Sequence, residues 1–193
     1  MSNRESKSTD SELESLRLEY CFDKGIDLKN RSIRISEEID EFETPAKIDA
    51  ALTDMESHSK KGITIKIISP GGSTYGALAI VDRIRMSKCK IVTVCLGQVM
   101  SAASLILAAG DKRIIGRYAW VMHHEFVVQP PEGSVSELER YTRQIRRELT
   151  AWSTAMANFT SKDAEFWISG AKNKDFYLTA EQALAAGVVD EIF

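Results

Sequence analysis

Two consecutive strand-to-helix units in the middle of the chain constrain its fold more than any other feature. An apolar, β-branched segment at residues 63–68 precedes a helical pattern at 76–87, and the same order recurs at 91–96 and 101–109. Parallel strands need a helical crossover of this length, so the alternation predicts βαβ units in a largely parallel sheet. The expected fold class is therefore α/β.

A long amphipathic pattern at residues 136–159 follows this alternation. Its apolar residues recur three or four positions apart, which predicts one continuous apolar stripe along a helix. We expect Ser136 and Glu139 to form a capping box at its start, as Thr179 and Gln182 do for a shorter helix. A helix of that length in a domain of this size either projects toward another subunit or packs on its own core.

The composition is that of a single-domain globular protein. Its 193 residues are 44% hydrophobic, and the net charge of −3 argues against nucleic acid as the main partner. The polar residues 1–20 are predicted to be a flexible arm in front of one domain over residues 21–193. The sequence shows neither a membrane-length apolar run nor a secretory signal, so we expect a cytoplasmic protein without a membrane partner. Cys89 and Cys95 lie in or beside an apolar strand without metal-ligand spacing, and no metal site is expected.

Ser101 is the strongest candidate for a catalytic residue. It stands between the strand at 91–96 and an apolar helix that begins at Ala102. The free N–H groups of a helix N-terminus favour negative charge that develops nearby. Ser101 is therefore either an ordinary N-cap or a nucleophile.

A serine nucleophile needs a base, and the sequence contains three histidines. His58 lies in a polar helix end, where a solvated histidine is usual. His123 and His124 end an apolar strand, and only one of them can face Ser101 because neighbouring side chains of a strand point to opposite faces. The residues alone do not distinguish the two.

Two further features fit a site for acyl transfer. Asp175 stands where a polar loop enters an aromatic segment, and a carboxylate there can orient the imidazole of a base. Gly71 and Gly72 follow the strand at 63–68, and the N–H groups of such a turn can form an oxyanion hole. Each also has an ordinary interpretation, as a loop aspartate and as a chain reversal.

Five motifs, in this order along the chain, resemble the family of Clp protease proteolytic subunits, ClpP. They are Ser69-Pro70-Gly71-Gly72-Ser73, Gly97-Gln98 with Ser101, Ala108 through Arg113, Val121-Met122 with His124, and Leu178 through Asp190. The resemblance extends from about Asp27 to the C-terminus. It implies a ClpP/crotonase-type βαβ spiral with a largely parallel sheet, in which the helix at 136–159 is a projecting handle.

The resemblance also implies a role for each candidate residue. Ser101 matches the nucleophile, His124 the general base and Asp175 the aspartate that orients this base. The backbone N–H groups of Gly72 and Ala102 match the oxyanion hole. The residues expected to bind a peptide substrate are Gly71, Ser73, Glu125 and Phe126.

The function implied by the resemblance is that of a serine endopeptidase without metal or organic cofactor. It would cleave unfolded chains or peptides inside a homo-oligomeric chamber, a heptameric ring or double ring. Unfoldases of the AAA+ class deliver substrates in this family. The chain has no Gly-x-x-x-x-Gly-Lys-Ser/Thr loop of its own, so any ATP dependence must come from such a partner.

Departures from the family pattern keep alternatives open. Ala102-Ala103 stands where the family has Met-Gly, and residues 127–132 replace a glycine-rich handle segment. Pro130 and Pro131 donate no N–H and so weaken strand pairing between rings. One alternative is a phage-type capsid maturation protease without an unfoldase, and another is a catalytically silent ring subunit.

Two other enzyme classes fit the sequence less well. A CoA-binding hydratase of the same broad fold has no need of a Ser-His-Asp set. A signal-peptide peptidase uses a serine with a lysine and requires a membrane segment.

Overall fold

The structure is a computed structural model that describes the backbone of residues 2–172 and 174–193 and the side chains from residue 13 onward within these ranges. The strands are β1 (Ile26–Asp27), β2 (Ser32–Ile35), β3 (Ile63–Ser69), β4 (Ile91–Met100), β5 (Lys112–Ile115), β6 (Trp120–His123), β7 (Phe176–Leu178) and β8 (Glu191–Ile192). The helices are α1 (Ser2–Lys24), α2 (Glu43–His58), α3 (Thr74–Arg85), α4 (Ala102–Ala108), α5 (Val135–Phe159), α6 (Ala164–Ala171) and α7 (Ala180–Ala185).

The sheet follows the path β1-β2-β3-β4-β5-β8, and all its pairs but β1–β2 are parallel. The long strand β4 pairs with two strands in succession. Its first part pairs with β5, and residues 98–100 pair with β6, which in turn pairs with β7 in antiparallel orientation. The predicted α/β class with a largely parallel sheet is confirmed.

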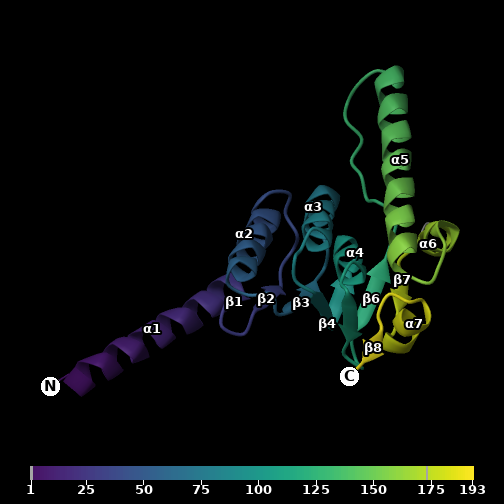
Figure 1. Cartoon of the computed structure of the whole chain (residues 1–193). Helices are drawn as coiled ribbons and strands as arrows, with labels where there is room; N and C mark the ends of the chain where they lie inside the picture. Colours follow the sequence, from purple (N-terminus) through teal and green to yellow (C-terminus); the bar gives the residue numbers. More distant parts are fainter. Residues whose placement is uncertain (1, 173) are drawn as a thin grey trace.

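The core lies between the sheet and the helices α2, α3 and α4, which cover one face side by side (Figure 1). Alternate residues of β3, Ile63, Ile65 and Ile67, are fully buried, as expected for a strand packed on one face. Every residue of α4 is buried. A rigid, apolar support therefore lies directly behind Ser101, at the N-terminus of α4.

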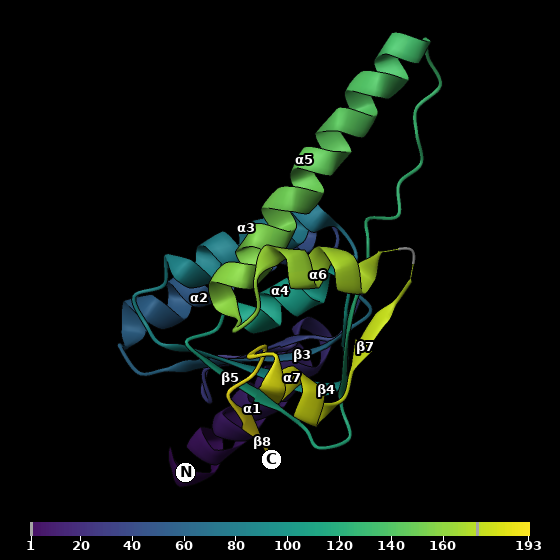
Figure 2. The same cartoon turned by 90° about the vertical axis from the view of Figure 1, so that its right-hand side faces the viewer.

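The helix α5 projects from the body of the protein, and the segment before it runs alongside the helix out to its far end (Figures 1 and 2). Only residues in its second half, Trp152, Ser153 and Met156, are buried. The predicted handle helix is present, but the predicted capping box is displaced. Ser134 and Glu137 form the box in place of Ser136 and Glu139, two residues earlier, and the helix begins at Val135.

Residues 2–24 form the helix α1, in the segment that the sequence predicted to be a flexible polar arm. The flexibility of this arm stays a prediction. The segment contains neither glycine nor proline, so nothing in it interrupts helix propagation. Arg17 contacts Glu14 within the helix at 2.9 Å and Asp27 of β1 at 2.7 Å, which ties the end of α1 to the sheet. The division at residues 20 and 21 stays a prediction. Within the described residues, the structure contains no helix of the length and apolarity required to span a membrane.

Candidate active site

Ser101 occupies a sharp turn between β4 and α4. Its φ of 50° and ψ of −126° lie in a region that residues other than glycine rarely adopt, at a cost of roughly 1–3 kcal/mol. Hydrogen bonds hold the turn: the Ser101 N–H donates to the carbonyl of Met122 at 2.8 Å, and the Ser104 hydroxyl donates to the carbonyl of Ser101 at 2.6 Å. The Ser101 side chain makes no capping hydrogen bond, so it is free of the structural role of an N-cap.

The histidine that meets Ser101 is His124. Its Nε2 lies 2.6 Å from the Ser101 Oγ. His123 points to the other face of β6, where it is 1% exposed and meets Trp167 edge-on, with ring centroids 5.4 Å apart. Burial, together with the charge of the neighbouring His124, lowers the pKa of His123 to about 4. Strand alternation therefore separates the two histidines, as the sequence predicted, and the structure shows which one faces Ser101.

Asp175 lies beyond hydrogen-bond distance of His124. Its Oδ1 is 4.0 Å from the His124 Nδ1, and its side chain is 53% exposed. The antiparallel register of β6 and β7 pairs His123 with Phe176, so the residue after His123 and the residue before Phe176 come to lie opposite each other. The structure thus brings together Ser101, His124 and Asp175, with one close contact and one long contact.

The glycine turn after β3 lies against Ser101. A Cβ on Gly71 would come within 2.6 Å of the Ser101 Cβ. Gly72 forms a parallel bridge with Ile39. The Ile39 N–H donates to the carbonyl of Gly71, and the Ser73 N–H donates to the carbonyl of Ile39, each at 2.7 Å. In a parallel bridge of this kind, the N–H of the central residue points away from its partner. The Gly72 N–H is therefore directed away from Ile39.

A second unpaired donor comes from α4. Ala102 is the first residue of the helix, and the first N–H groups of a helix have no intrahelical acceptor. The described residues offer no hydrogen-bond acceptor to the N–H of either Gly72 or Ala102. Gly72 and Ala102 line one cavity with Ser101, so their N–H groups are candidates for stabilising an oxyanion.

A cavity of about 440 Å³ opens beside Ser101. Of the four residues predicted to bind a peptide, Phe126 lines this cavity, and Glu125 lines an adjoining one. Ser73 instead caps α3 by accepting a hydrogen bond from the Gly76 N–H at 3.1 Å. Gly71 lies against Ser101 outside the cavity lining.

Residues that sequence reasoning did not assign to the site also line the cavity. They include Thr74, Tyr75, Ile145, Glu148 and Trp152. Ile145 and Trp152 belong to the apolar stripe of α5. Such a stripe predicts packing on the core and does not indicate a ligand-binding site. No group of three or more potential metal ligands occurs among the described residues.

The sequence profile of Clp proteases matches residues 20–193. The chain belongs to the Clp protease family. The ATP-dependent Clp protease proteolytic subunit 1 of Corynebacterium glutamicum is 40% identical to it over 135 residues, which cover 69% of this chain and 64% of that protein. The corresponding subunit of Corynebacterium diphtheriae is 38% identical over the same shares. The matched region thus spans slightly less than two thirds of these relatives.

A solved structure gives the same assignment. A ClpP1 mutant from Listeria monocytogenes superimposes with a TM-score of 0.77 and 28% sequence identity, over 86% of this Clp-family chain and 92% of that one. The ClpP-type fold that the sequence motifs implied is therefore confirmed.

Proposed function

We propose that this Clp-family chain is a serine endopeptidase that hydrolyses peptide bonds through Ser101, His124 and Asp175. The observation that carries the proposal is the 2.6 Å contact between the His124 Nε2 and the Ser101 Oγ. A serine hydroxyl becomes a useful nucleophile when a base within hydrogen-bond distance can accept its proton. The backbone of Ser101 is strained, as expected where a side chain must be exposed for reaction.

The reaction is acyl transfer in two halves. His124 takes the Ser101 proton while the Oγ attacks the carbonyl carbon, and the N–H groups of Gly72 and Ala102 stabilise the oxyanion. His124 then gives its proton to the leaving amine, and an acyl-serine ester remains. Water, deprotonated by His124, hydrolyses that ester, and the proton returns to Ser101. The cycle consumes one water for each peptide bond and needs no cofactor.

Asp175 is assigned the role of orienting His124 and stabilising its protonated form. At 4.0 Å the ion-pair contact is loose, and the carboxylate remains half exposed. Catalytic hydrogen bonds are often long in an unliganded enzyme and shorten when substrate is bound. We expect substrate or a neighbouring subunit to shorten this one.

The substrate is proposed to be an extended segment of unfolded polypeptide. We propose that this segment binds in a cleft between two walls. One wall is the turn at Gly71–Ser73, and the other is the segment that begins at Glu125 and Phe126; each can pair with an added strand. The N–H of Gly72, directed away from Ile39, belongs to the first wall.

The working form is proposed to be a cytoplasmic homo-oligomer, a heptameric ring or double ring. Three exposed apolar side chains, Ile68, Trp120 and Tyr177, border one surface cavity and would be covered by a neighbouring subunit. Curated relatives are named ATP-dependent, and the chain has no phosphate-binding loop of its own, so we propose an AAA+ unfoldase as the ATP-using partner.

The segment before α5 supports an alternative in which the rings do not pair through added strands. Residues 124–134 form no strand, and Pro130 and Pro131 remove two N–H donors from it. This supports a protease that works without strand pairing between rings, such as a phage-type maturation protease without an unfoldase.

The test is cleavage of unfolded casein by the purified oligomer, with products identified by mass spectrometry. We expect cleavage by wild type and none by Ser101→Ala or His124→Ala. The matched control is His58→Ala, because His58 is exposed on α2 and should be dispensable. Cleavage retained in Ser101→Ala would overturn the proposal. An assembled wild type that leaves casein intact would favour the silent ring subunit.

A further inference from the structure

We propose that the cavity beside Ser101 receives a lysine or arginine side chain and that Glu148 is the residue that selects it. This inference rests on the proposed function and specifies the bond cleaved, namely the peptide bond on the carboxyl side of a basic residue. Glu148 lies on α5, far from Ser101 in the sequence, and it lines the same cavity as Ser101.

The position of the cavity makes it the site for the side chain next to the attacked carbonyl. Ser101, Gly72 and Ala102 all border it, and these residues would hold the carbonyl carbon and its oxygen. The side chain of the same substrate residue must then enter the cavity. Ala102 is small and 4% exposed, so little side-chain bulk obstructs the entrance.

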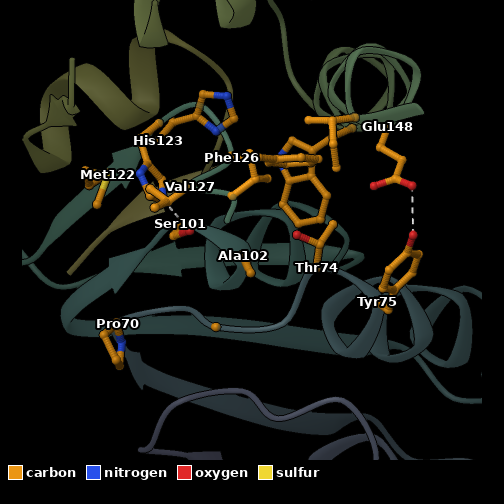
Figure 3. A pocket seen from close by; sticks show the side chains of 15 residues that line it. Pro70, Thr74, Tyr75, Ser101, Ala102, Met122, His123, Phe126, Val127 and Glu148 are labelled. Carbon is orange, nitrogen blue, oxygen red and sulfur yellow. Dashed lines mark hydrogen bonds between the residues drawn. The ribbon is translucent and has the colours of Figure 1, made fainter. Parts of the chain in front are cut away.

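The middle of the cavity is apolar. Phe126 and Trp152 contribute two aromatic rings that meet edge to face, with centroids 6.0 Å apart, and Trp152 is 3% exposed. In the view of Figure 3, Phe126 is drawn between Ser101 and Glu148. Lysine and arginine carry an apolar stem behind the charged group, and such stems pack well on apolar surfaces.

The carboxylate of Glu148 lies at the far end of the cavity, and one of its two oxygens accepts hydrogen bonds. The Tyr75 hydroxyl and the Gln144 amide both donate to the Oε1 of Glu148, each at 2.8 Å, as Figure 3 shows for Tyr75. Among the described residues, none donates to the Oε2. The two donors fix the orientation of the carboxylate and leave the Oε2 available to an incoming cation.

The charge of the cavity favours a cation. Glu148 is the one carboxylate among the residues that line it, and lysine and arginine are absent from that lining. Arg146, on the same helix, lines the adjoining cavity instead. The hydrogen bond to Glu148 and the negative charge of that carboxylate raise the pKa of Tyr75.

The test compares two fluorogenic peptides that differ only in the residue before the cleaved bond. One carries lysine and the other norleucine, which has the same stem without the charge. Because norleucine cannot make the charge-assisted hydrogen bond to Glu148, we expect kcat/KM to favour lysine by about 10- to 100-fold. Glu148→Gln should reduce this ratio to near unity. The matched control is Glu139→Gln, an exposed glutamate of the same helix, which should keep the wild-type ratio.

A second measurement separates this inference from the proposed function. In a Ser101→Ala background, fluorescence anisotropy measures binding of peptides that end in lysine or norleucine. Tighter binding of the lysine peptide, lost on adding Glu148→Gln, supports the inference even if the wild type cleaves nothing, and in that case the proposed function alone would fall. Equal binding and equal cleavage of the two peptides would overturn the inference and leave the proposed protease activity standing.

Discussion

The Oδ1 of Asp175 lies 4.0 Å from the Nδ1 of His124, whereas the Nε2 of the same imidazole lies 2.6 Å from the Ser101 Oγ. The two halves of the candidate triad therefore differ in how tightly they are formed. Ser101 precedes the fully buried helix α4, and His124 follows β6, in which Val121 and His123 are buried. The aspartate half rests on an exposed residue in front of the short strand β7.

The first prediction concerns this difference. We expect Asp175→Asn to lower the rate of peptide cleavage about 10- to 100-fold, less than His124→Ala, because the carboxylate acts only through the imidazole. The double variant should be no slower than His124→Ala alone, which a double-mutant cycle of kcat/KM measures. Additive losses would contradict a positioning role for Asp175.

The second prediction concerns the turn at Gly72. A Cβ there would approach the Ile39 carbonyl oxygen to 2.3 Å at a φ of +136°. We expect Gly72→Ala to destabilise the protein by about 2–4 kcal/mol and to slow Ser101 acylation about 100-fold, because the N–H is displaced.

The control for this variant is Gly97→Ala. Gly97 also has a positive φ, of +64°, but its nearest neighbour to an added Cβ is 4.0 Å away. Its cost should be about 1 kcal/mol, without loss of acylation. Urea unfolding measures the loss of stability, and the rate of Ser101 acylation measures the loss of activity. Equal acylation rates in Gly72→Ala and Gly97→Ala would refute the assignment of the Gly72 N–H to the oxyanion hole.

The third prediction concerns acid stability. Because burial lowers the pKa of His123 to about 4 from 6.5, the unfolded chain binds more protons than the folded one between these values. The free energy of unfolding is therefore unaffected by the titration of His123 above pH 6.5, and it falls by about 3 kcal/mol as the pH decreases toward 4. His123→Phe keeps an aromatic ring beside Trp167 and should flatten the pH dependence of urea unfolding. His58→Phe, at an exposed site, should not.

The fourth prediction concerns Tyr75. Its phenol donates to Glu148, and ionisation would place two negative charges together, so its pKa is raised. We expect Tyr75 to titrate above the usual value near 10 and to return toward it in Glu148→Gln. NMR titration of labelled tyrosine, assigned with Tyr75→Phe, measures the shift. An unchanged titration in Glu148→Gln would show that the contact does not persist in solution.

Much of the fold follows from local sequence patterns. The alternation of strands and helices predicts the parallel sheet, and the capping box at Thr179 and Gln182 is confirmed. The box of α5 is wrong by two residues because Ser-x-x-Glu occurs at both Ser134 and Ser136. Local pattern alone does not say which serine ends the extended segment before the helix.

The candidate site depends on contacts that no local pattern contains. The strand β7 has only three residues, and its pairing with β6 is what brings Asp175 opposite His124. Helical periodicity identifies the apolar residues of α5 that pack on the core, but it does not indicate a role for Glu148. The position of Glu148 matters through Tyr75, a residue on another helix and distant in the chain.

The most direct test of the account is intact-mass labelling of the assembled oligomer with a fluorophosphonate. An activated Ser101 predicts one adduct on each wild-type chain and none on Ser101→Ala or His124→Ala, with the oligomeric state of all three verified by native mass spectrometry. Absence of an adduct on properly assembled wild type, or equal labelling of Ser101→Ala, would contradict the assignment of Ser101 as a nucleophile activated by His124.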